Sequence, residues 1–374
     1  MQDALHISPE GWGLVTGAFF LSYSIFEIPS GILGDRISPR KVLTRIVLWW
    51  SAFTSLTGAV SSFSLLVLVR FLFGMGEAGA YPNISVVLAR QLPAAIRGRG
   101  WGFVFSASQL GGALSPLIVV PLQARYGWRA SFFVLGSLGI VWAVIWFLSY
   151  HEARERTEEH RPIAWKTALP STPLWQIAGI GACYLYVMSF FWSWLQTYLV
   201  KGRGYTEAAL VLSSLPYLLG AAAAFGGGFV SDWLVRRLGL RAGRRALGAF
   251  ALGAAAFFMA AAVLSRDNLW ALIFLSFSYM FILLQQPNVG AVALDIGGRN
   301  AGGVFGFLNT AANAASSVSS VAFGYMVQHY GNYDAPFAPM ILTLLAGAFL
   351  WIRIDPTREL FPAEPLHAAA IAIN

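Results

Sequence analysis

The sequence predicts an all-α protein that is embedded in a membrane. Of its 374 residues, 57% are hydrophobic and only 11% are charged, whereas about 25% of the residues in a typical soluble domain are charged. The mean hydropathy is +0.63. Eleven apolar stretches are long enough to cross a bilayer as helices; they lie near residues 12–34, 42–63, 65–88, 101–122, 130–149, 173–199, 207–234, 246–264, 269–290, 301–327 and 336–352.

The distribution of basic residues predicts the orientation of these spans. If the loop at 35–45 is cytoplasmic and the chain then alternates sides, the cytoplasmic loops and tail contain 19 of the 25 Lys and Arg residues. The opposite side contains 5, and Arg70 lies within a span. Because cytoplasmic loops carry an excess of Lys and Arg, we expect the C-terminus in the cytoplasm and the N-terminus outside. No positively charged segment precedes the first span, so we expect no signal peptide.

An internal repeat divides the chain into two halves. Gly31 and Asp35 at the end of the first span match Gly228 and Asp232 at the end of the seventh, at an offset of 197 residues. The polar stretch 150–171 lies between the halves. Two similar halves are typical of secondary transporters. We therefore predict an N-terminal helical bundle, a cytoplasmic linker, a C-terminal helical bundle and a cytoplasmic tail, at residues 1–149, 150–171, 172–354 and 355–374.

Two charged residues, Arg70 and Glu77, lie within one predicted span. Seven residues separate them, which is close to two helical turns, so they share a helix face with Gly74 and Tyr81. A charge in the bilayer costs at least a few kcal/mol and usually faces an interior cavity where it has a function. A guanidinium binds carboxylates with two hydrogen bonds, and burial favours the neutral form of a carboxyl, which suits a proton carrier. The pair predicts an anion site beside a proton site.

Simpler interpretations of this pair stay open. Arg70 could extend toward the membrane interface or pair with backbone carbonyls of another helix. Glu77 could be a permanently protonated packing residue. A second acid, Glu27, lies about eight residues before the end of its span, and it is either a structural partner for a cytoplasmic arginine or a second proton site.

Two further sets of residues are candidates. The loop after the first span combines one acid with several basic residues, which predicts a conformational latch that changes partners between two states; its members are Asp35, Arg36, Arg40 and Lys41, with Asp232 as a weaker copy. Alternatively, the basic residues only fix the topology. Polar side chains within apolar helices either line a pocket or hold neighbouring helices together; the candidates are Tyr23, Gln109 and Asn309.

The sequence offers no catalytic or cofactor site. Its single cysteine, Cys183, excludes an internal disulfide, and its histidines all fall in predicted loops or tails. No metal cluster, phosphate-binding loop or Ser/His/Asp set is present at membrane depth, so we expect neither an enzyme nor a metal or cofactor. The basic residues lie in short loops between apolar stretches, and we expect no nucleic-acid partner.

The residues after the first span resemble the signature loop of the major facilitator superfamily, with Ser38 where glycine is usual; the matching residues are Gly31, Leu33, Asp35, Arg36, Pro39, Arg40 and Lys41. Within that superfamily the chain resembles the anion:cation symporter family, through residues 19–31, 70–82, 106–112, 191–199 and 302–309. The resemblance implies two six-helix bundles that bind substrate between them at mid-membrane. It also implies alternating access, in which an organic anion moves with a proton or sodium.

The resemblance implies roles for particular residues. The arginine at the position of Arg70 helps to bind the substrate carboxylate, and the glutamate at Glu77 takes part in proton coupling. Tyr23, Gln109 and Asn309 stand where the family lines its pocket. Glutamine is common in the family where Glu27 stands here. The family's first helix carries an Asp-Arg pair, and the repeat indicates that this helix, the first of the usual twelve, is missing from this chain.

Together these observations predict a multi-pass protein of the plasma (inner) membrane that imports a small organic anion together with a proton, with sodium as the alternative ion. A sugar acid such as a hexonate or hexuronate is the expected substrate. We expect a monomer whose other partner is the lipid bilayer. Two alternatives stay open: a neutral-solute or drug exporter of the same superfamily, and a membrane sensor or truncated pseudo-transporter that binds without translocating.

Overall fold

The computed structural model describes the chain except residues 37, 92–96, 151–167, 298–300, 359 and 361–374. For a few other helical residues, among them 31–36, it describes the backbone alone. The predicted linker and tail therefore lie mostly outside the described residues, as do the side chains of Asp35 and Arg36.

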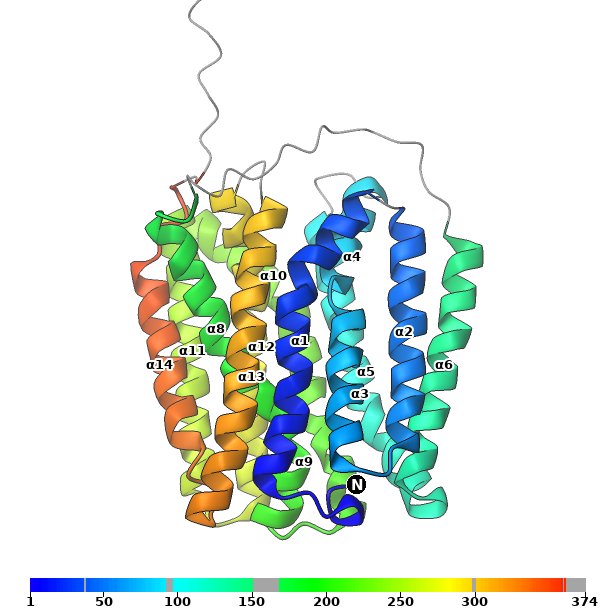
Figure 1. The fold of residues 1–374 in the computed structure, drawn as a ribbon. Helices are drawn as coiled ribbons and strands as arrows, with labels where there is room; N and C mark the ends of the chain where they lie inside the picture. Colours follow the sequence, from blue (N-terminus) through cyan, green and yellow to red (C-terminus); the bar gives the residue numbers. More distant parts are fainter. Residues whose placement is uncertain (37, 92–96, 151–167, 298–300, 359, 361–374) are drawn as a thin grey trace, which may run out of the picture.

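The described secondary structure is helical, as predicted (Figure 1). The longer helices of the first half are α1 (Pro9–Arg36), α2 (Pro39–Ala59), α3 (Phe63–Glu77), α4 (Ala80–Gln91), α5 (Arg97–Tyr126) and α6 (Trp128–Ser149). Those of the second half are α8 (Thr172–Ser193), α10 (Ser214–Leu238), α11 (Leu240–Leu264), α12 (Asn268–Gly297), α13 (Ala301–Tyr330) and α14 (Phe337–Arg353). Shorter helical segments are η1 (Asp3–Leu5), α9 (Leu195–Thr197), η3 (Tyr198–Gly202) and η4 (Glu207–Ser213).

The predicted count of eleven spans is not confirmed. A helix covers each predicted range, but eight segments of the described chain are both long and apolar enough to cross a membrane. The ranges 42–63, 301–327 and 336–352 fall outside those eight. Basic residues at the start of α2, many small and polar residues in α13, and the 17-residue length of α14 account for this difference.

One predicted helix is in fact two. The range 65–88 was expected to be continuous, but α3 ends at Glu77 and α4 starts at Ala80. Gly79, between them, has φ +86°, which glycine adopts at little cost and other residues avoid. The expectation was wrong here because a glycine inside an apolar stretch does not by itself indicate a break.

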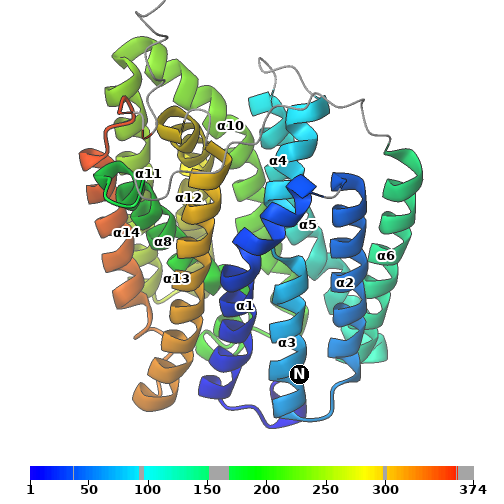
Figure 2. The same ribbon diagram turned by 45° about the horizontal axis from the view of Figure 1, so that its top comes forward.

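The helices form two groups by their contacts. Within the first half α2 packs on α6 and α1 packs on α3; within the second, α12 packs on α10 and α11, and α8 packs on α13 and α14. The groups meet along α1 and α13 and along α5 and α10. Figures 1 and 2 both show α1 beside α13, with α2 and α6 on one side and α11 and α14 on the other.

The halves differ in how much of each helix is covered. In the apolar 18-residue stretch of α8, 67% is buried inside the protein, whereas in the corresponding stretches of α5 and α6 only 17% is buried. Among the described residues, no helix packs on α5 and α6 as α8 packs on α13 and α14. The absence of a first helix stays a prediction.

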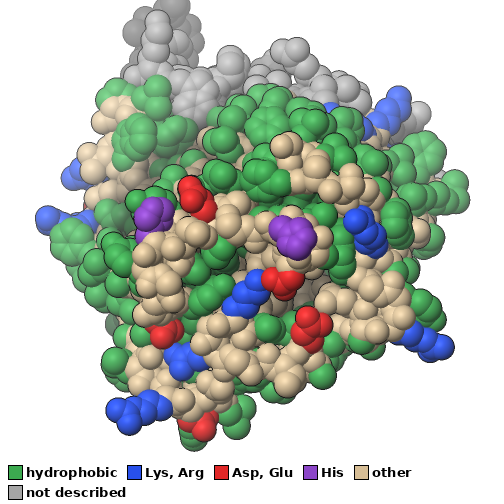
Figure 3. All heavy atoms as spheres, turned by 60° about the horizontal axis from the view of Figure 1, so that its bottom comes forward, with side chains coloured by type: hydrophobic (Ala, Val, Ile, Leu, Met, Phe, Trp, Pro, Cys, Tyr) green, Lys and Arg blue, Asp and Glu red, His purple; other side chains and the backbone are tan. Residues whose placement is uncertain are grey.

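The two ends of the helical bundle are distinct. We call the end that contains Met1 and the start of α1 the Met1 face, and the end where α6 stops and α8 starts the linker face (Figure 1). At the Met1 face the halves touch closely: Trp12 donates its indole N–H to the carbonyl of Ser193 (3.0 Å), and Lys201 pairs with Asp3 (2.6 Å). Figure 3 shows acidic and basic side chains scattered over this face among hydrophobic side chains, other side chains and backbone.

Candidate functional site

Arg70 projects from α3 and lies beside two aromatic rings that also contact each other, with their centres 5.5 Å apart. Its guanidinium carbon is 5.0 Å from the ring centre of Phe73 and 5.3 Å from that of Phe19 in α1. Such cation–π contacts favour a cation without using its hydrogen-bond donors. Within the described part of the chain, none of its five N–H donors has a protein acceptor. The arrangement orients a guanidinium and leaves it able to bind an anion.

A glycine brings α1 close enough to α3 for this contact. A Cβ on Gly74 would lie 2.3 Å from the carbonyl oxygen of Phe19, so no larger residue fits there without moving a helix. Gly74 is on the face of α3 that the sequence assigned to Arg70 and Glu77. Its small size explains how Phe19 reaches the arginine.

Glu77 is the last residue of α3 and is half-buried at the break before α4. Its helix therefore ends where the chain unwinds through Ala78 and Gly79. No ion pair joins Glu77 to Arg70 within the described residues. The two charges thus stay separate, as the two-turn spacing predicts.

Glu27 has more specific contacts than Glu77. It is fully buried. One carboxylate oxygen accepts a hydrogen bond from the backbone N–H of Gly79 (3.1 Å), and the other accepts from the side-chain amide of Asn309 in α13 (2.8 Å). Glu27 therefore joins α1 to the break between α3 and α4 and to the other half. Among the described residues it contacts no arginine.

The other predicted pocket residues divide between two places. Tyr23 lies one turn before Glu27 on α1 and is nearly buried, and its ring centre is 6.0 Å from that of Phe19. Asn309 contacts Glu27, and its carbonyl accepts from Asn313 (3.0 Å). These residues belong to the α1–α13 contact.

Gln109 belongs to the other contact between the halves. Its side-chain oxygen accepts a hydrogen bond from the hydroxyl of Tyr279 in α12 (2.7 Å), and both side chains are buried. Tyr217 of α10 packs against Tyr279 at 5.3 Å between ring centres. The sequence suggested Gln109 but not Tyr279, because nothing in the sequence connects residues 170 positions apart.

The predicted latch is only partly described. Arg40 donates from Nε to the carbonyl of Phe147 at the end of α6 (2.9 Å), its Nη2 contacts the same carbonyl, and its guanidinium lies 4.2 Å from the Phe147 ring centre. Lys41 and Asp232 are exposed. The side chains of Asp35 and Arg36 lie outside the described residues, so the latch stays a prediction.

A polar cluster in the second half was missed. Arg244 of α11 pairs with Asp295 of α12 (3.2 Å) and donates to the hydroxyl of Ser231 in α10 (2.6 Å). Ser231 donates in turn to Asn288 (2.9 Å), whose amide donates to the carbonyl of Arg244 (2.8 Å). One signal was available, since an arginine at the start of a span and an aspartate at the end of another are both costly unless paired.

This arrangement defines a class of protein: a multi-pass helical membrane protein whose two halves meet along α1–α13 and α5–α10, with an arginine in a membrane helix that pairs with no carboxylate among the described residues. The chain belongs to the Major Facilitator Superfamily, whose family model matches residues 1–320. Membership makes it an integral membrane transporter and not an enzyme, which confirms the family prediction.

Relatives agree with the resemblance to anion:cation symporters. The chain is 31% identical to "Probable sulfoacetate transporter SauU" of Cupriavidus necator, over 95% of this chain and 87% of that protein. It is 29% identical to "Hexuronate transporter" of Bacillus subtilis, over 93% and 85% of the two chains. It is also 29% identical to "Probable galactarate/D-glucarate transporter GudP" of Escherichia coli, over 89% and 82%.

A solved structure shows the same fold. A bacterial homologue of the human lysosomal transporter Spinster, crystallised in an inward-facing and unoccupied conformation, superposes with a TM-score of 0.73 at 18% identity. The match covers 95% of this chain and 91% of that one. At this identity the likeness establishes the fold alone.

Proposed function

We propose that this protein is a secondary active transporter that moves a small organic anion together with a proton by alternating access. A sugar acid such as a hexonate or hexuronate is the proposed substrate. The observation that carries the proposal is the position of Arg70, whose guanidinium contacts Phe19 and Phe73 and has no acceptor for its N–H groups among the described residues. A carboxylate or sulfonate satisfies that guanidinium with two parallel hydrogen bonds.

The named substrates of the relatives support this choice of chemistry. Sulfoacetate, hexuronate, galactarate and D-glucarate all carry at least one acid group. A neutral substrate would leave Arg70 without a partner inside the membrane, which is costly. The proposal therefore assigns Arg70 to the acid group, and assigns Tyr23, Asn309 and Gln109 to the pocket around the rest of the substrate.

The two buried acids supply the coupling. Glu77 lies at the end of α3, two turns from Arg70, and is the proposed proton carrier, with sodium as the alternative ion. Glu27 is the second proposed coupling group, because its carboxylate contacts both the helix break and the opposite half. A proton on Glu27 changes a contact that joins the two halves, which links proton binding to the change of state.

The arrangement in the membrane completes the proposal. We assign residues 1–149 and 172–354 to the two moving bundles, 150–171 to the linker and 355–374 to the tail. The linker face and the C-terminus are cytoplasmic, the membrane is the plasma (inner) membrane, and the protein works as a monomer. Asp35, Arg36, Arg40, Lys41 and Asp232 form the latch at the cytoplasmic side.

Proton movement in proteoliposomes tests this function. A pH-sensitive dye is trapped inside, and hexonates, hexuronates, sulfoacetate and a neutral hexose are added outside. Internal acidification with an acid substrate but not with the hexose is the expected result. Arg70→Ala and Glu77→Gln should each abolish it, while Arg266→Ala, which removes an exposed arginine at the Met1 face, should leave it unchanged.

Three outcomes would contradict the proposal. Acidification with the neutral hexose would favour a neutral-solute transporter. Uptake of a radiolabelled acid that needs a sodium gradient and moves no protons would show that sodium, and not the proton, is the coupling ion. Binding of an acid without any uptake would favour a sensor.

A further inference from the structure

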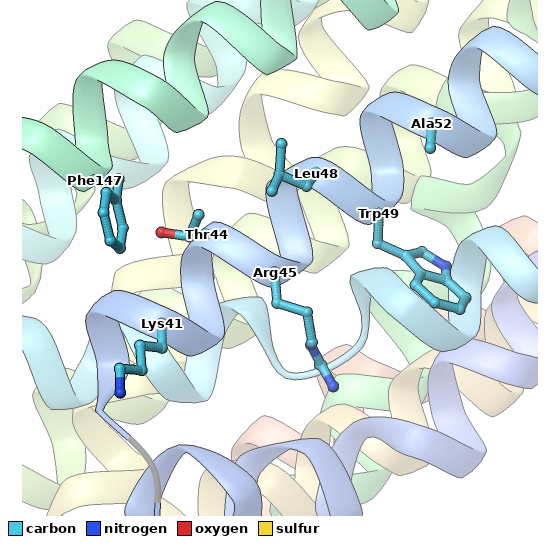
Figure 4. A pocket seen from close by; sticks show the side chains of 7 residues that line it. All are labelled: Lys41, Thr44, Arg45, Leu48, Trp49, Ala52 and Phe147. Atoms are coloured by element: carbon cyan, nitrogen blue, oxygen red, sulfur yellow. The ribbon is translucent and has the colours of Figure 1, made fainter.

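A hollow on the outer side of the first half contains two basic side chains. It has a volume of about 530 Å³ and lies along α2, between Phe147 of α6 and Trp49 (Figure 4). Lys41 and Arg45 extend from α2 toward the same side, and Leu48 and Ala52 continue the lining along the helix. Lys41, Arg45, Leu48 and Ala52 are all exposed, and their spacing of three or four residues places them on one face of α2.

The two ends of this hollow differ in chemistry. Lys41 is the third residue of α2 and lies near the linker face, where bilayer headgroups are found. Ala52 is eleven residues further, about 16 Å deeper along the helix axis. The hollow therefore has a basic entrance at headgroup level and an apolar floor that runs toward the middle of the bilayer.

Among the described residues, the basic entrance has no carboxylate partner. Arg45 donates one hydrogen bond to the hydroxyl of Ser30 (3.2 Å). In the part of the chain that the structure describes, neither Arg45 nor Lys41 pairs with a carboxylate. An anionic ligand would supply the missing negative charge.

The second half provides an internal comparison. α11 starts like α2, but its third and seventh residues, Ala242 and Ala246, stand where α2 has Lys41 and Arg45. These alanines are also exposed, so the face is open in both halves but is basic in only one.

The arginines that do occur at the start of α11 are bound by the protein. Arg241 pairs with Asp355 (3.5 Å), and Arg245 donates to the carbonyl of Ile354 (2.6 Å). Arg244 pairs with Asp295. The pair Lys41 and Arg45 is therefore not a general feature of the repeat.

We propose that this hollow is a binding site for one anionic phospholipid. The phosphate lies between Lys41 and Arg45, and an acyl chain follows Leu48 and Ala52 between Phe147 and Trp49. Basic pockets between membrane helices recognise anionic headgroups in this manner, and the apolar floor excludes a free phosphate as the intended ligand.

Native mass spectrometry of the delipidated protein tests the site. The protein is titrated with phosphatidylglycerol or with phosphatidylcholine of the same acyl chains, and the first bound lipid is quantified. We expect tighter binding of phosphatidylglycerol. Lys41→Ala and Arg45→Ala should each weaken it by about fivefold, since each basic residue near an anionic headgroup contributes about 1 kcal/mol. Phosphatidylcholine binding should not change.

Two further variants separate charge from shape. Ala52→Trp fills the floor and keeps both cations, and it should weaken phosphatidylglycerol binding without affecting the charge at the entrance. Arg236→Ala with Arg237→Ala removes two exposed cations near the end of α10 and should leave binding unchanged. Size-exclusion chromatography verifies that each variant is folded. If Lys41→Ala or Arg45→Ala is not folded, the glutamine substitution at the same position replaces it.

Four results would overturn the proposal. Equal affinity for the two lipids would mean ordinary lipid contact. An unchanged affinity in the Lys41 and Arg45 variants would place the lipid elsewhere. Displacement of the lipid by glycerol 3-phosphate at comparable concentration would indicate a phosphate site. A dimer that dissociates on Ala52→Trp while the bound lipid persists would show that a second copy of the chain covers this face.

Discussion

Glu27 and Asn309 form a hydrogen bond of 2.8 Å across the contact between α1 and α13, and the second oxygen of the same carboxylate accepts the N–H of Gly79 at the break between α3 and α4. One buried side chain therefore connects the two halves of the protein with the point where a membrane helix is interrupted. Both partners are donors, and each accepting oxygen of the carboxylate serves one of them.

This relationship predicts different effects for two substitutions of Glu27. Glu27→Gln keeps the shape but turns one acceptor into an NH₂ donor that faces another donor. Glu27→Ala leaves the Gly79 N–H and the Asn309 amide without partners. Because a hydrogen bond to a charged group contributes about 1.5–3 kcal/mol, we expect both variants to unfold at lower temperature, the alanine variant more so.

A thermal-unfolding series with Asn309→Ala checks this. If the two residues act through one bond, the double variant Glu27→Gln/Asn309→Ala should lose less stability than the sum of the single variants. Strict additivity would contradict a direct coupling. Ser317→Ala is the control, because it removes a different hydrogen bond across the same contact, from Ser317 to the carbonyl of Gly17 (2.9 Å).

Gly79 predicts a second effect. Its φ of +86° is unfavourable for other residues, and a Cβ there would lie 2.5 Å from the Cβ of Ser30. A non-glycine residue in such a conformation costs about 1–3 kcal/mol, so we expect Gly79→Ala to lower the thermal stability and the transport rate. Gly226→Ala is the matched control, because no atom lies within 4 Å of a Cβ at that position. Equal melting temperatures of the two variants would show that the break is not required.

These residues also show how far the sequence predicts the site. The hydropathy pattern predicted where the helices lie, because a membrane span needs about 20 apolar residues. The 100° periodicity placed Arg70, Gly74 and Glu77 on one face, since that relation is local. The helix break was not predictable in this way: it depends on Glu27, 52 residues earlier in the chain, accepting the N–H that the break leaves free.

Contacts between distant segments account for the other omissions. The pair Gln109 and Tyr279 joins residues 170 positions apart, and the pair Arg244 and Asp295 joins residues 51 apart. Composition and spacing along one helix contain no information about such partners. The sequence identified Gln109 as polar within an apolar helix, but only the packing of α5 beside α10 and α12 shows what it contacts.

The Met1 face predicts a pH dependence that is separate from transport coupling. Lys201 donates to Asp3 at 2.6 Å, which lowers the pKa of Asp3 below its usual value. Because this pKa is lowered, the ion pair stabilises the Met1 face at all pH values above the ordinary pKa of an aspartate, near 4. This stabilisation is lost as the pH falls through the lower pKa that Asp3 has in the folded protein.

We therefore expect Asp3→Asn to destabilise the protein by a small and constant amount between about pH 5.5 and 8, where Asp3 stays ionised. An exposed pair of this kind contributes about 0.2–1 kcal/mol. Melting temperatures of the native protein and the variant should differ by the same amount across this range and converge in stronger acid. A difference that changes between pH 6 and 7 would contradict this assignment.

The cluster around Arg244 predicts a large structural effect where the sequence suggested none. Arg244 serves Asp295 and Ser231 at once, through different nitrogens of one guanidinium. A lysine at this position has one ammonium group on a flexible chain and cannot reproduce that fork. We expect Arg244→Lys to destabilise the second half even though the charge is kept.

Asp295→Ala should have a stronger effect, because it leaves the largely buried Arg244 without its carboxylate; breaking a fully buried pair costs about 3–5 kcal/mol, and this partly exposed pair should approach the lower end. Arg241→Ala on the same helix is the control, since Arg241 is itself exposed to solvent in its 3.5 Å pair with Asp355, and a pair with one exposed partner contributes about 1 kcal/mol or less. The melting temperatures of Arg244→Lys, Asp295→Ala and Arg241→Ala in detergent rank the three variants by their loss of stability. If Arg241→Ala is as destabilising as Asp295→Ala, burial does not set the strength of these pairs, and the cluster has no special part in joining α10, α11 and α12.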